Sequence, residues 1–184
     1  RGAVLPMTFG HEVAGIVQAV GPEVNSVKPG QQVLVFPWIG CGECDACNED
    51  RESDCAAMRI IGLKQKGGFA THCLVEHDKF LVDIDGLDAA DVVPHACSGI
   101  TVFNALEKMG ALRSDEWIAI MGCGGLGMNA ISIARAMSFN NIIAVDIDNG
   151  KLEAALEMGA TKVLNSKNDD AVSELQKLAE GRLM

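Results

Sequence analysis

The spacing of apolar residues along the chain changes near residue 95. Before that point, apolar residues form short runs bounded by glycine and proline. Residues 13–20 (VAGIVQAV) and 33–36 (VLVF) are rich in β-branched side chains, and Lys-Pro-Gly at 28–30 predicts a turn between them. Two more short strands are expected within residues 67–84. Short strands joined by glycine-rich turns predict a compact all-β unit.

After that point the chain follows the pattern of an α/β fold. Apolar residues at helical spacing predict helix within residues 88–110, and residues 116–165 then alternate strand, helix, strand, helix, strand. The three strands are expected to begin near Trp117, Ile142 and Val163. A last amphipathic helix is expected over residues 171–179. We therefore predict two domains, an all-β domain over residues 1–95 and an α/β domain over residues 96–184.

Charge and cysteine usage narrow the class of protein. The 184 residues include 25 acidic and 15 basic side chains, a net charge of −10, which disfavours binding to nucleic acid. No apolar run approaches the roughly 20 residues that cross a bilayer, and no secretory signal is recognisable. Seven cysteines, an odd number, then indicate the reducing cytoplasm, where clustered thiols more often hold metal than form disulfides.

Four of the cysteines, Cys41, Cys44, Cys47 and Cys55, lie within fifteen residues in the segment GCGECDACNEDRESDC. Each C-x2-C step lets two thiolates converge from a tight loop, and the last cysteine returns a fourth. Four thiolates match a structural zinc site, which leaves no position open for substrate. Iron–sulfur ligation, a redox dithiol and a nucleic-acid-binding zinc ribbon are the alternatives. Iron–sulfur ligation is disfavoured because ferredoxin motifs use other cysteine spacings. A redox dithiol would need only two cysteines, and the acidic charge of the chain disfavours a nucleic-acid-binding ribbon.

A second motif, GCGGLG at residues 122–127, follows an apolar strand and opens a helix. Gly122 would allow a tight turn, Gly124 would let the backbone approach a pyrophosphate, and Gly127 would let helix and strand pack closely. Free N–H groups at the helix N-terminus favour the phosphates. The candidate cofactor-binding residues of this loop are Gly122, Gly124, Gly125, Leu126 and Gly127.

Asp146 closes the next strand, nineteen residues beyond Gly127. A carboxylate there can accept hydrogen bonds from both hydroxyls of an adenosine ribose, and it would repel a 2′-phosphate. NAD is therefore favoured over NADP. A turn residue at the end of a strand is the alternative interpretation of Asp146.

In their order, these motifs resemble the zinc-dependent alcohol dehydrogenases of the medium-chain dehydrogenase/reductase superfamily. GHEVAGIV looks like the family's Gly-His-Glu signature, the segment 40–56 looks like its structural zinc lobe, CSGITVFNAL like its hinge segment, and GCGGLG with AVDID like its coenzyme fingerprint. The resemblance implies a partial GroES-like all-β catalytic domain followed by the first half of a Rossmann doubly wound domain. It also implies hydride transfer between an alcohol and NAD to give an aldehyde or ketone, with Zn²⁺ and NAD as cofactors.

The resemblance assigns a catalytic zinc to particular residues. His11 and Cys97 would be ligands, and Glu12 would lie beside the ion as an outer group or an alternate ligand. A zinc with an open position would polarise the substrate oxygen and favour the alkoxide. The family's other ligand, a cysteine upstream of the signature, has no counterpart among the ten residues before His11.

Further roles follow from the same resemblance. Thr101 would lie against the nicotinamide, Lys151 would approach the adenosine ribose, and Trp38 would line the substrate pocket. The full-length protein would be a homo-oligomer.

The chain contains three of the six strands of a complete coenzyme domain. We therefore expect it to be the middle part of a longer dehydrogenase, with little or no activity in isolation and with the strand that begins near Trp117 at an open sheet edge. The alternative function is a non-catalytic zinc-binding module or an inactive truncated homologue. A related reductase or polyol dehydrogenase is a further possibility within the superfamily.

Overall fold

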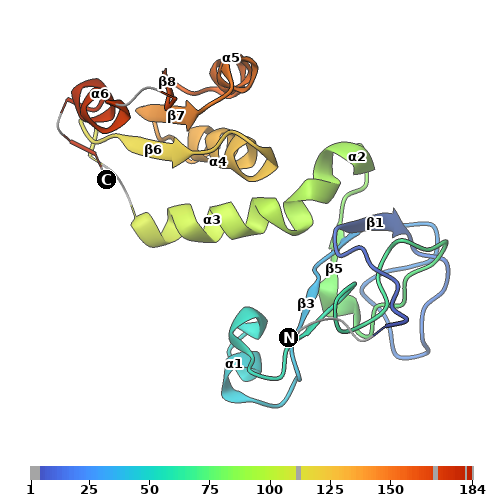
Figure 1. Cartoon of the computed structure of the whole chain (residues 1–184). Helices are drawn as coiled ribbons and strands as arrows, with labels where there is room; N and C mark the ends of the chain where they lie inside the picture. Colours follow the sequence, from blue (N-terminus) through green and yellow to red (C-terminus); the bar gives the residue numbers. More distant parts are fainter. Residues whose placement is uncertain (1–4, 111–112, 168–169, 181, 184) are drawn as a thin grey trace. The chain divides into compact units, whose positions relative to one another are not determined.

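The computed structural model describes residues 5–110, 113–167, 170–180 and 182–183. The chain divides into two compact units, Arg1–Cys97 and Ser98–Met184, and Figure 1 labels the elements of each. The all-β character predicted for the first unit and the α/β character predicted for the second are both confirmed by these elements.

The first unit is built on a three-stranded antiparallel sheet in the order β1-β2-β5. These strands are β1 (Val13–Ile16), β2 (Gln32–Val35) and β5 (Leu81–Asp83). A separate two-stranded ladder joins β3 (Trp38–Ile39) to β4 (Arg59–Ile60). The short helical segments of this unit are α1 (Asp45–Asn48), η1 (Glu52–Asp54), η2 (Asp78–Phe80), α2 (Ala89–Val92) and η3 (Val93–Ala96). The strand predicted at 13–20 therefore forms but ends at Ile16.

The core of the first unit lies between the sheet and the two-stranded ladder. Its buried members are Val35, Ile39, Ile61 and Phe80. Phe36 stacks on Phe80 with 6.3 Å between ring centroids. The apolar runs of the first half therefore bury side chains from β2, from β3, from the residue after β4 and from the end of η2 together.

The prediction of two strands within residues 67–84 was wrong, because only β5 forms there among the described residues. The backbone at the start of this segment crosses the chain before β1 instead. The Gly67 N–H donates to the Thr8 carbonyl and the Gly68 N–H to the Gly10 carbonyl, each at 2.8 Å. A Cβ on Gly67 would lie 2.2 Å from the Gly10 carbonyl oxygen, so this close approach requires glycine.

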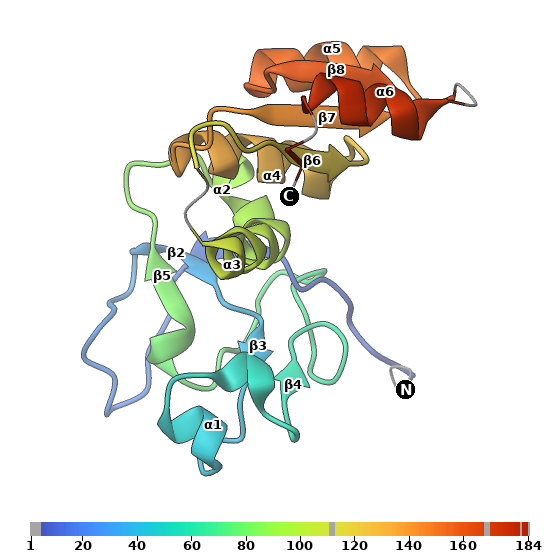
Figure 2. The same cartoon turned by 90° about the vertical axis from the view of Figure 1, so that its left-hand side faces the viewer.

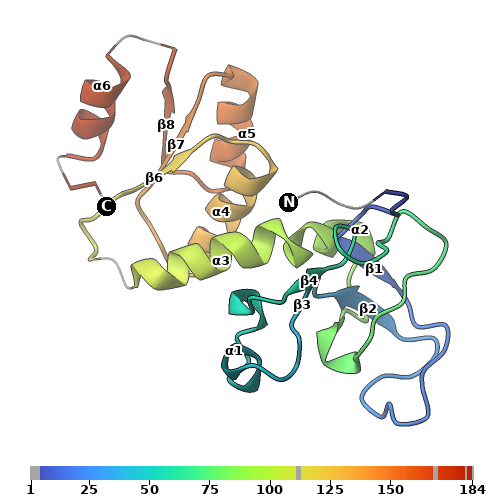
Figure 3. The same ribbon diagram turned by 60° about the horizontal axis from the view of Figure 1, so that its bottom comes forward.

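The second unit has a parallel sheet in the order β6-β7-β8, as the alternating pattern predicted. Its strands are β6 (Ile118–Met121), β7 (Ile142–Asp146) and β8 (Lys162–Asn165). Its helices are α3 (Ser98–Met109), α4 (Gly125–Ala136), α5 (Asn149–Met158) and α6 (Ala171–Leu178). Figures 1 and 3 show α4 and α5 on one face of the sheet and α6 on the other.

Alternate residues of β7 enter two different cores. Ile142 and Ala144 pack with α3, α4 and α5, whereas Ile143 and Val145 pack with Trp117 and the α6 side. Every residue of β7 is buried, which is typical of a parallel strand covered on both faces. Figure 2 views this sheet from the α6 side, with β7 between β6 and β8.

The strand β6 lies at the edge of this sheet, as predicted. It pairs with β7 over its length. On its other side, the described residues place only Leu183, which forms a parallel bridge with Trp117 just before the strand. The main-chain groups on that side of Ile118–Met121 have no strand partner within the described part of the chain.

Candidate metal centres and coenzyme loop

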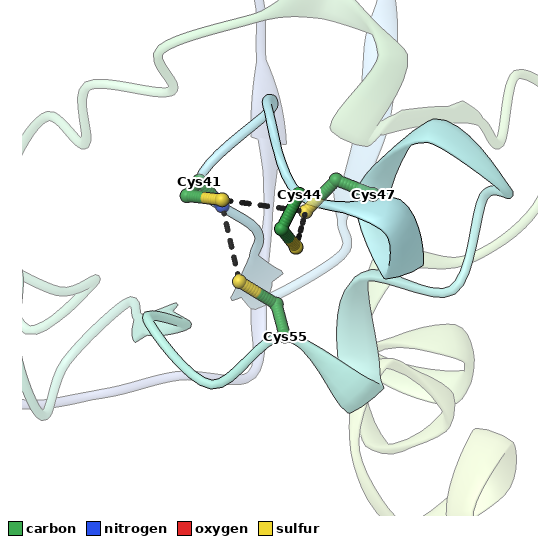
Figure 4. A group of neighbouring side chains, drawn as sticks. All are labelled: Cys41, Cys44, Cys47 and Cys55. Carbon is green, nitrogen blue, oxygen red and sulfur yellow. Dashed lines mark hydrogen bonds between the residues drawn. The ribbon is translucent and has the colours of Figure 1, made fainter.

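The four-cysteine loop brings four sulfur atoms together. The Sγ atoms of Cys41, Cys44, Cys47 and Cys55 all lie within 4.8 Å of one another (Figure 4). The Sγ of Cys47 is 3.6 Å from that of Cys44 and 3.9 Å from that of Cys41. A tetrahedral zinc with Zn–S bonds of about 2.3 Å separates its sulfurs by about 3.8 Å. The loop therefore fits a closed, four-thiolate zinc site.

Local structure sets this geometry. Gly42 has φ +84°, which lets the chain turn between Cys41 and Cys44. The short helix α1 begins directly after Cys44 and carries Cys47 inward to a buried position. The Cys41 N–H donates to the Cys55 Sγ at 3.4 Å, so a backbone group already supports the fourth sulfur.

Backbone hydrogen bonds also prepare the first thiol for ligation. N–H groups of Glu43 and Cys44 lower the pKa of Cys41 to about 6. For Cys44, the Cys47 backbone acts to lower the pKa, but the neighbouring sulfurs of Cys47 and Cys41 raise it to about 11. One sulfur of the crowded set is therefore readily ionised without an ion, and a bound cation would be needed to hold all four as thiolates.

Three residues outside the cysteine pattern support this loop, and the sequence analysis did not single them out. A Cβ on Gly40 would lie 2.5 Å from the Cys47 Sγ and 2.7 Å from the Glu52 Cγ. Glu52 is buried, and its carboxylate forms an ion pair with Lys79 that lowers the pKa of Glu52. A glycine directly before the first cysteine was the only signal of this packing in the sequence.

A second group of possible ligands combines two residues directly before β1 with one directly after η3. The ligand atoms of His11, Glu12 and Cys97 fall within 4.8 Å of one another, so the structure brings these three predicted residues together. Burial raises the pKa of the Cys97 thiol, and the negative charge of Glu12 adds to this effect. Three ligand atoms, with Glu12 exposed, leave a position open for a further ligand. This donor set fits an open zinc site rather than a closed one.

The coenzyme loop has the backbone that its glycines predicted. Gly122 has φ +89°, and a Cβ on Gly127 would lie 1.8 Å from the Gly122 carbonyl oxygen. A Cβ on Gly124 or Gly125 would meet nothing within 4 Å, so the backbone here is open to a ligand. The loop and Leu126 line a shallow hollow of about 340 Å³ at the N-terminus of α4. Free N–H groups at this helix end favour an anion.

Asp146 ties this loop to the end of β7, a role that the sequence analysis did not foresee. Its Oδ2 accepts from the Cys123 N–H at 2.7 Å, and its Oδ1 accepts from the N–H groups of Ile147 and Asp148 at 2.7 and 3.0 Å. These bonds, that from Cys123 first, hold the pKa of Asp146 below its ordinary value. Burial opposes ionisation of this side chain, but the three backbone N–H groups outweigh it, so the carboxylate stays ionised and oriented beside the loop.

The other predicted site residues are placed as follows. Trp38 is half-buried on β3, with its ring 5.5 Å from that of Phe36. Thr101 is exposed in the first turn of α3. Lys151 is exposed near the start of α5, where its N–H donates to the Asp148 side chain at 3.1 Å. The roles of these three residues toward coenzyme and substrate remain predictions.

Comparison with known families matches both units. Residues 1–86 match the Alcohol dehydrogenase GroES-like domain, and residues 125–184 match the Zinc-binding dehydrogenase domain. The NAD-dependent alcohol dehydrogenase of Sulfurisphaera tokodaii is 39% identical over 181 residues, 98% of this chain and 52% of that protein. An alcohol dehydrogenase of Geobacillus stearothermophilus is 38% identical over 179 residues, 96% of this chain and 52% of that protein.

Solved structures show the same fold. The alcohol dehydrogenase from Aeropyrum pernix aligns with a TM-score of 0.89 at 29% identity, covering 98% of this chain and 53% of that one. The D-arabinose dehydrogenase from Sulfolobus solfataricus aligns with a TM-score of 0.88 at 31% identity, covering 98% of this chain and 56% of that one. The chain thus spans about half the length of the curated relatives it matches.

A GroES-like domain followed by the start of a Rossmann-like domain, with cysteine and histidine clusters suited to zinc, defines a zinc-binding dehydrogenase. Within that class, the chain belongs to the zinc-dependent alcohol dehydrogenases of the medium-chain dehydrogenase/reductase superfamily. The predictions of family and fold class are confirmed by these matches, and the zinc-binding description of the second matched domain supports the prediction of Zn²⁺. The relative from Sulfurisphaera tokodaii is named as NAD-dependent. None of the helices in the described part of the chain combines the length and apolarity that a membrane crossing needs.

Proposed function

We propose that this chain serves an NAD-linked, zinc-dependent alcohol dehydrogenase that converts an alcohol to its aldehyde or ketone. The observation that carries the proposal is the cluster of His11, Glu12 and Cys97, whose ligand atoms lie within 4.8 Å of one another. This cluster contains the residue types of an open catalytic zinc site, and the same chain carries a nucleotide-binding loop.

In the proposed reaction, the residues of the chain have the following roles. A zinc held by His11 and Cys97 would supply Lewis-acid polarisation of the alcohol oxygen. Glu12, exposed beside them, provides an alternate ligand or a second acceptor near the same position. The substrate loses a hydride from carbon to NAD⁺ and a proton from oxygen to solvent. Trp38 and Thr101 line the substrate and the nicotinamide, respectively, in this proposal.

The coenzyme preference follows from Asp146. Its carboxylate is ionised and held at the end of β7, so it would accept bonds from ribose hydroxyls and repel a 2′-phosphate. Lys151 approaches the same ribose from the first turn of α5. We therefore propose NAD rather than NADP as the coenzyme of this chain.

The organisation of the protein is part of the proposal. A domain boundary at residues 95–96 is supported by the division of the chain after Cys97. Seven cysteines without a disulfide among the described residues support the cytoplasm as the compartment. We propose small alcohols, aldehydes or ketones as the substrates, and a homo-oligomer as the state of the full-length enzyme. The 184 residues by themselves would show little turnover.

Zinc content of the purified chain tests the proposal directly. We expect one tight equivalent that Cys44→Ser removes, and a weaker equivalent that His11→Ala removes while the tight one stays. Titration with NAD should show saturable binding that Asp146→Arg shifts toward NADP. Zinc binding without any coenzyme binding would instead favour the non-catalytic zinc-binding module. A chain that binds neither cofactor would contradict both functions.

A further inference from the structure

We infer that the ion pair between Lys79 and Glu52 is a positioning device for the four-cysteine site. It fastens the η1 segment to the core of the first unit and thereby keeps the sulfur atoms converged. The inference rests on the proposed function, because it takes the loop to hold a metal ion.

The pair joins two segments that are far apart in the chain. Glu52 begins η1, three residues before the ligand Cys55, whereas Lys79 lies on η2, directly before β5. Twenty-seven residues separate them. Glu52 is only 9% exposed, and Lys79 provides its charged partner. A buried carboxylate without such a partner is strongly disfavoured, so η1 is held where Lys79 can reach it.

The contacts of the Glu52 stem carry this constraint to the sulfur atoms. Gly40 is packed so closely that a Cβ there would touch both the Cys47 Sγ at 2.5 Å and the Glu52 Cγ at 2.7 Å. Glu52 and Cys47 therefore share one surface at the end of β3. A displacement of the Glu52 side chain would open the space against which Cys47 is packed.

The Lys79 end of the pair is fixed to the core. Its Nζ lies 5.0 Å from the ring centroid of Phe80, a buried member of the core of the first unit. This cation–π contact orients the ammonium on the side of the core that faces Glu52. The ion pair thus links the metal loop to a rigid part of the unit, as outer partners of metal ligands commonly do.

A purely electrostatic role would have the opposite signature. Four thiolates around Zn²⁺ leave a net charge of −2, which a nearby ammonium would stabilise directly. In that case, neutralising Glu52 would remove a competing negative charge, and metal would bind more tightly. If the pair acts by positioning, neutralising either member releases η1, and metal binds more weakly in both variants.

The chain offers a matched control in the same lobe. Arg51 precedes Glu52 and pairs with Glu49 at 2.6 Å and with Asp54 at 2.9 Å, but its side chain is 52% exposed. Arg51→Met removes the same unit of charge as Lys79→Met at a neighbouring position. Exposed pairs of this kind contribute little, so metal affinity should change less than about fivefold.

The experiment measures Co²⁺ and Zn²⁺ affinity of the full 184-residue chain by competition with a chelator, together with the thiolate-to-cobalt absorption bands. Lys79→Met and Glu52→Gln should each weaken binding by about 10- to 100-fold and alter the cobalt bands. Lys79→Arg should restore most of the affinity. The double variant Lys79→Met/Glu52→Gln should bind metal no more weakly than the single variant with the lower affinity, because the two residues act as one unit.

Several results would overturn the inference. Unchanged or tighter metal binding in Glu52→Gln would favour the electrostatic role. Equal losses of metal affinity in Lys79→Met and Arg51→Met would show that Lys79 acts only through its charge. Amide exchange in β2, which belongs to the same unit as the ion pair, should be unchanged in all variants, and this separates a local effect from unfolding of that unit. The proposed four-cysteine site itself would be overturned if the wild-type chain bound no metal, or if Cys44→Ser did not remove the metal that it binds.

Discussion

The four-cysteine loop and the coenzyme loop obtain their shapes from different sources. The coenzyme loop is held by bonds within the protein: Asp146 accepts three backbone N–H groups, and Gly127 packs directly on Gly122. The four-cysteine loop also has backbone N–H groups that support its sulfurs, at Cys41 and at Cys55, but it gathers four sulfurs that repel one another once ionised. The first loop is formed in advance of its ligand, whereas the second needs its ion as part of the structure.

Metal removal should show this difference most strongly. A chelator that strips the four-cysteine site should unfold the segment 40–56, because structural zinc supplies on the order of 10 kcal/mol to such small lobes. The sheet β6-β7-β8 should keep its protection. Hydrogen exchange read by mass spectrometry would measure both regions in one sample. Equal loss of protection in the two units would break the comparison.

Gly127→Ala should be the most damaging single change in the coenzyme loop. Its Cβ would lie 1.8 Å from a backbone oxygen that cannot move aside cheaply, so we expect a loss of about 3 kcal/mol of unfolding free energy. NAD binding should be lost at the same time. Gly124→Ala is the matched control, because its Cβ meets nothing within 4 Å and the fold should survive. Thermal unfolding and NAD titration check both variants.

Asp146→Asn should weaken NAD binding about 10- to 100-fold, since hydrogen bonds to a charged group are replaced by weaker ones. The variant also tests a pH dependence. The pKa of Asp146 is below its ordinary 3.8, so its stabilising effect is present above that value and is lost as the pH falls through the lower folded pKa. Acid unfolding of the wild type should contain this contribution, and that of Asp146→Asn should lack it. Identical acid profiles would contradict the expectation.

Lys162→Met should have the smallest effect of these changes. It should lower the free energy of unfolding without changing the affinity for NAD. The Lys162 Nζ lies 4.0 Å from the ring centroid of Trp117 and donates to the Leu178 carbonyl at 2.7 Å, at the end of α6. We expect a loss of about 1 kcal/mol in urea unfolding. NAD affinity should be unchanged, because these contacts lie on the α6 side of the sheet, away from the loop. A parallel fall in NAD affinity would show that the loop depends on this face as well.

Local patterns predicted most of the second unit. The run IIAVD reads as a doubly covered strand because each of its side chains is apolar until Asp146, and β7 has those bounds. The glycine spacing likewise predicted the turn at Gly122, since only glycine adopts its positive φ at low cost. Cysteine spacing predicted the convergence of four sulfurs for the same reason: the information lies within a few adjacent residues.

Long-range contacts could not be predicted in this way. Nothing near Glu52 indicates that Lys79 will cover it, because the pairing depends on where η2 lies in three dimensions. The bond from the Cys123 N–H to Asp146 is similarly invisible, although both residues were in recognised motifs. The prediction of a second strand within residues 67–84 was wrong for a related reason. The apolar pattern of this segment suits a strand, but its backbone partners belong to a segment near residue 10.

The crossing of residues 67–68 over residues 8–10 also has a consequence for mutational tolerance. A Cβ on Gly62 would lie 2.5 Å from the Gly10 carbonyl oxygen, and one on Gly68 would lie 2.5 Å from the Val13 Cγ2. These glycines touch the segment that carries His11 but contribute no ligand atom. In a library of single substitutions selected for metal binding, such positions should be depleted nearly as strongly as the ligands. Intolerance to substitution in this chain therefore marks the scaffold of a site as readily as its chemistry.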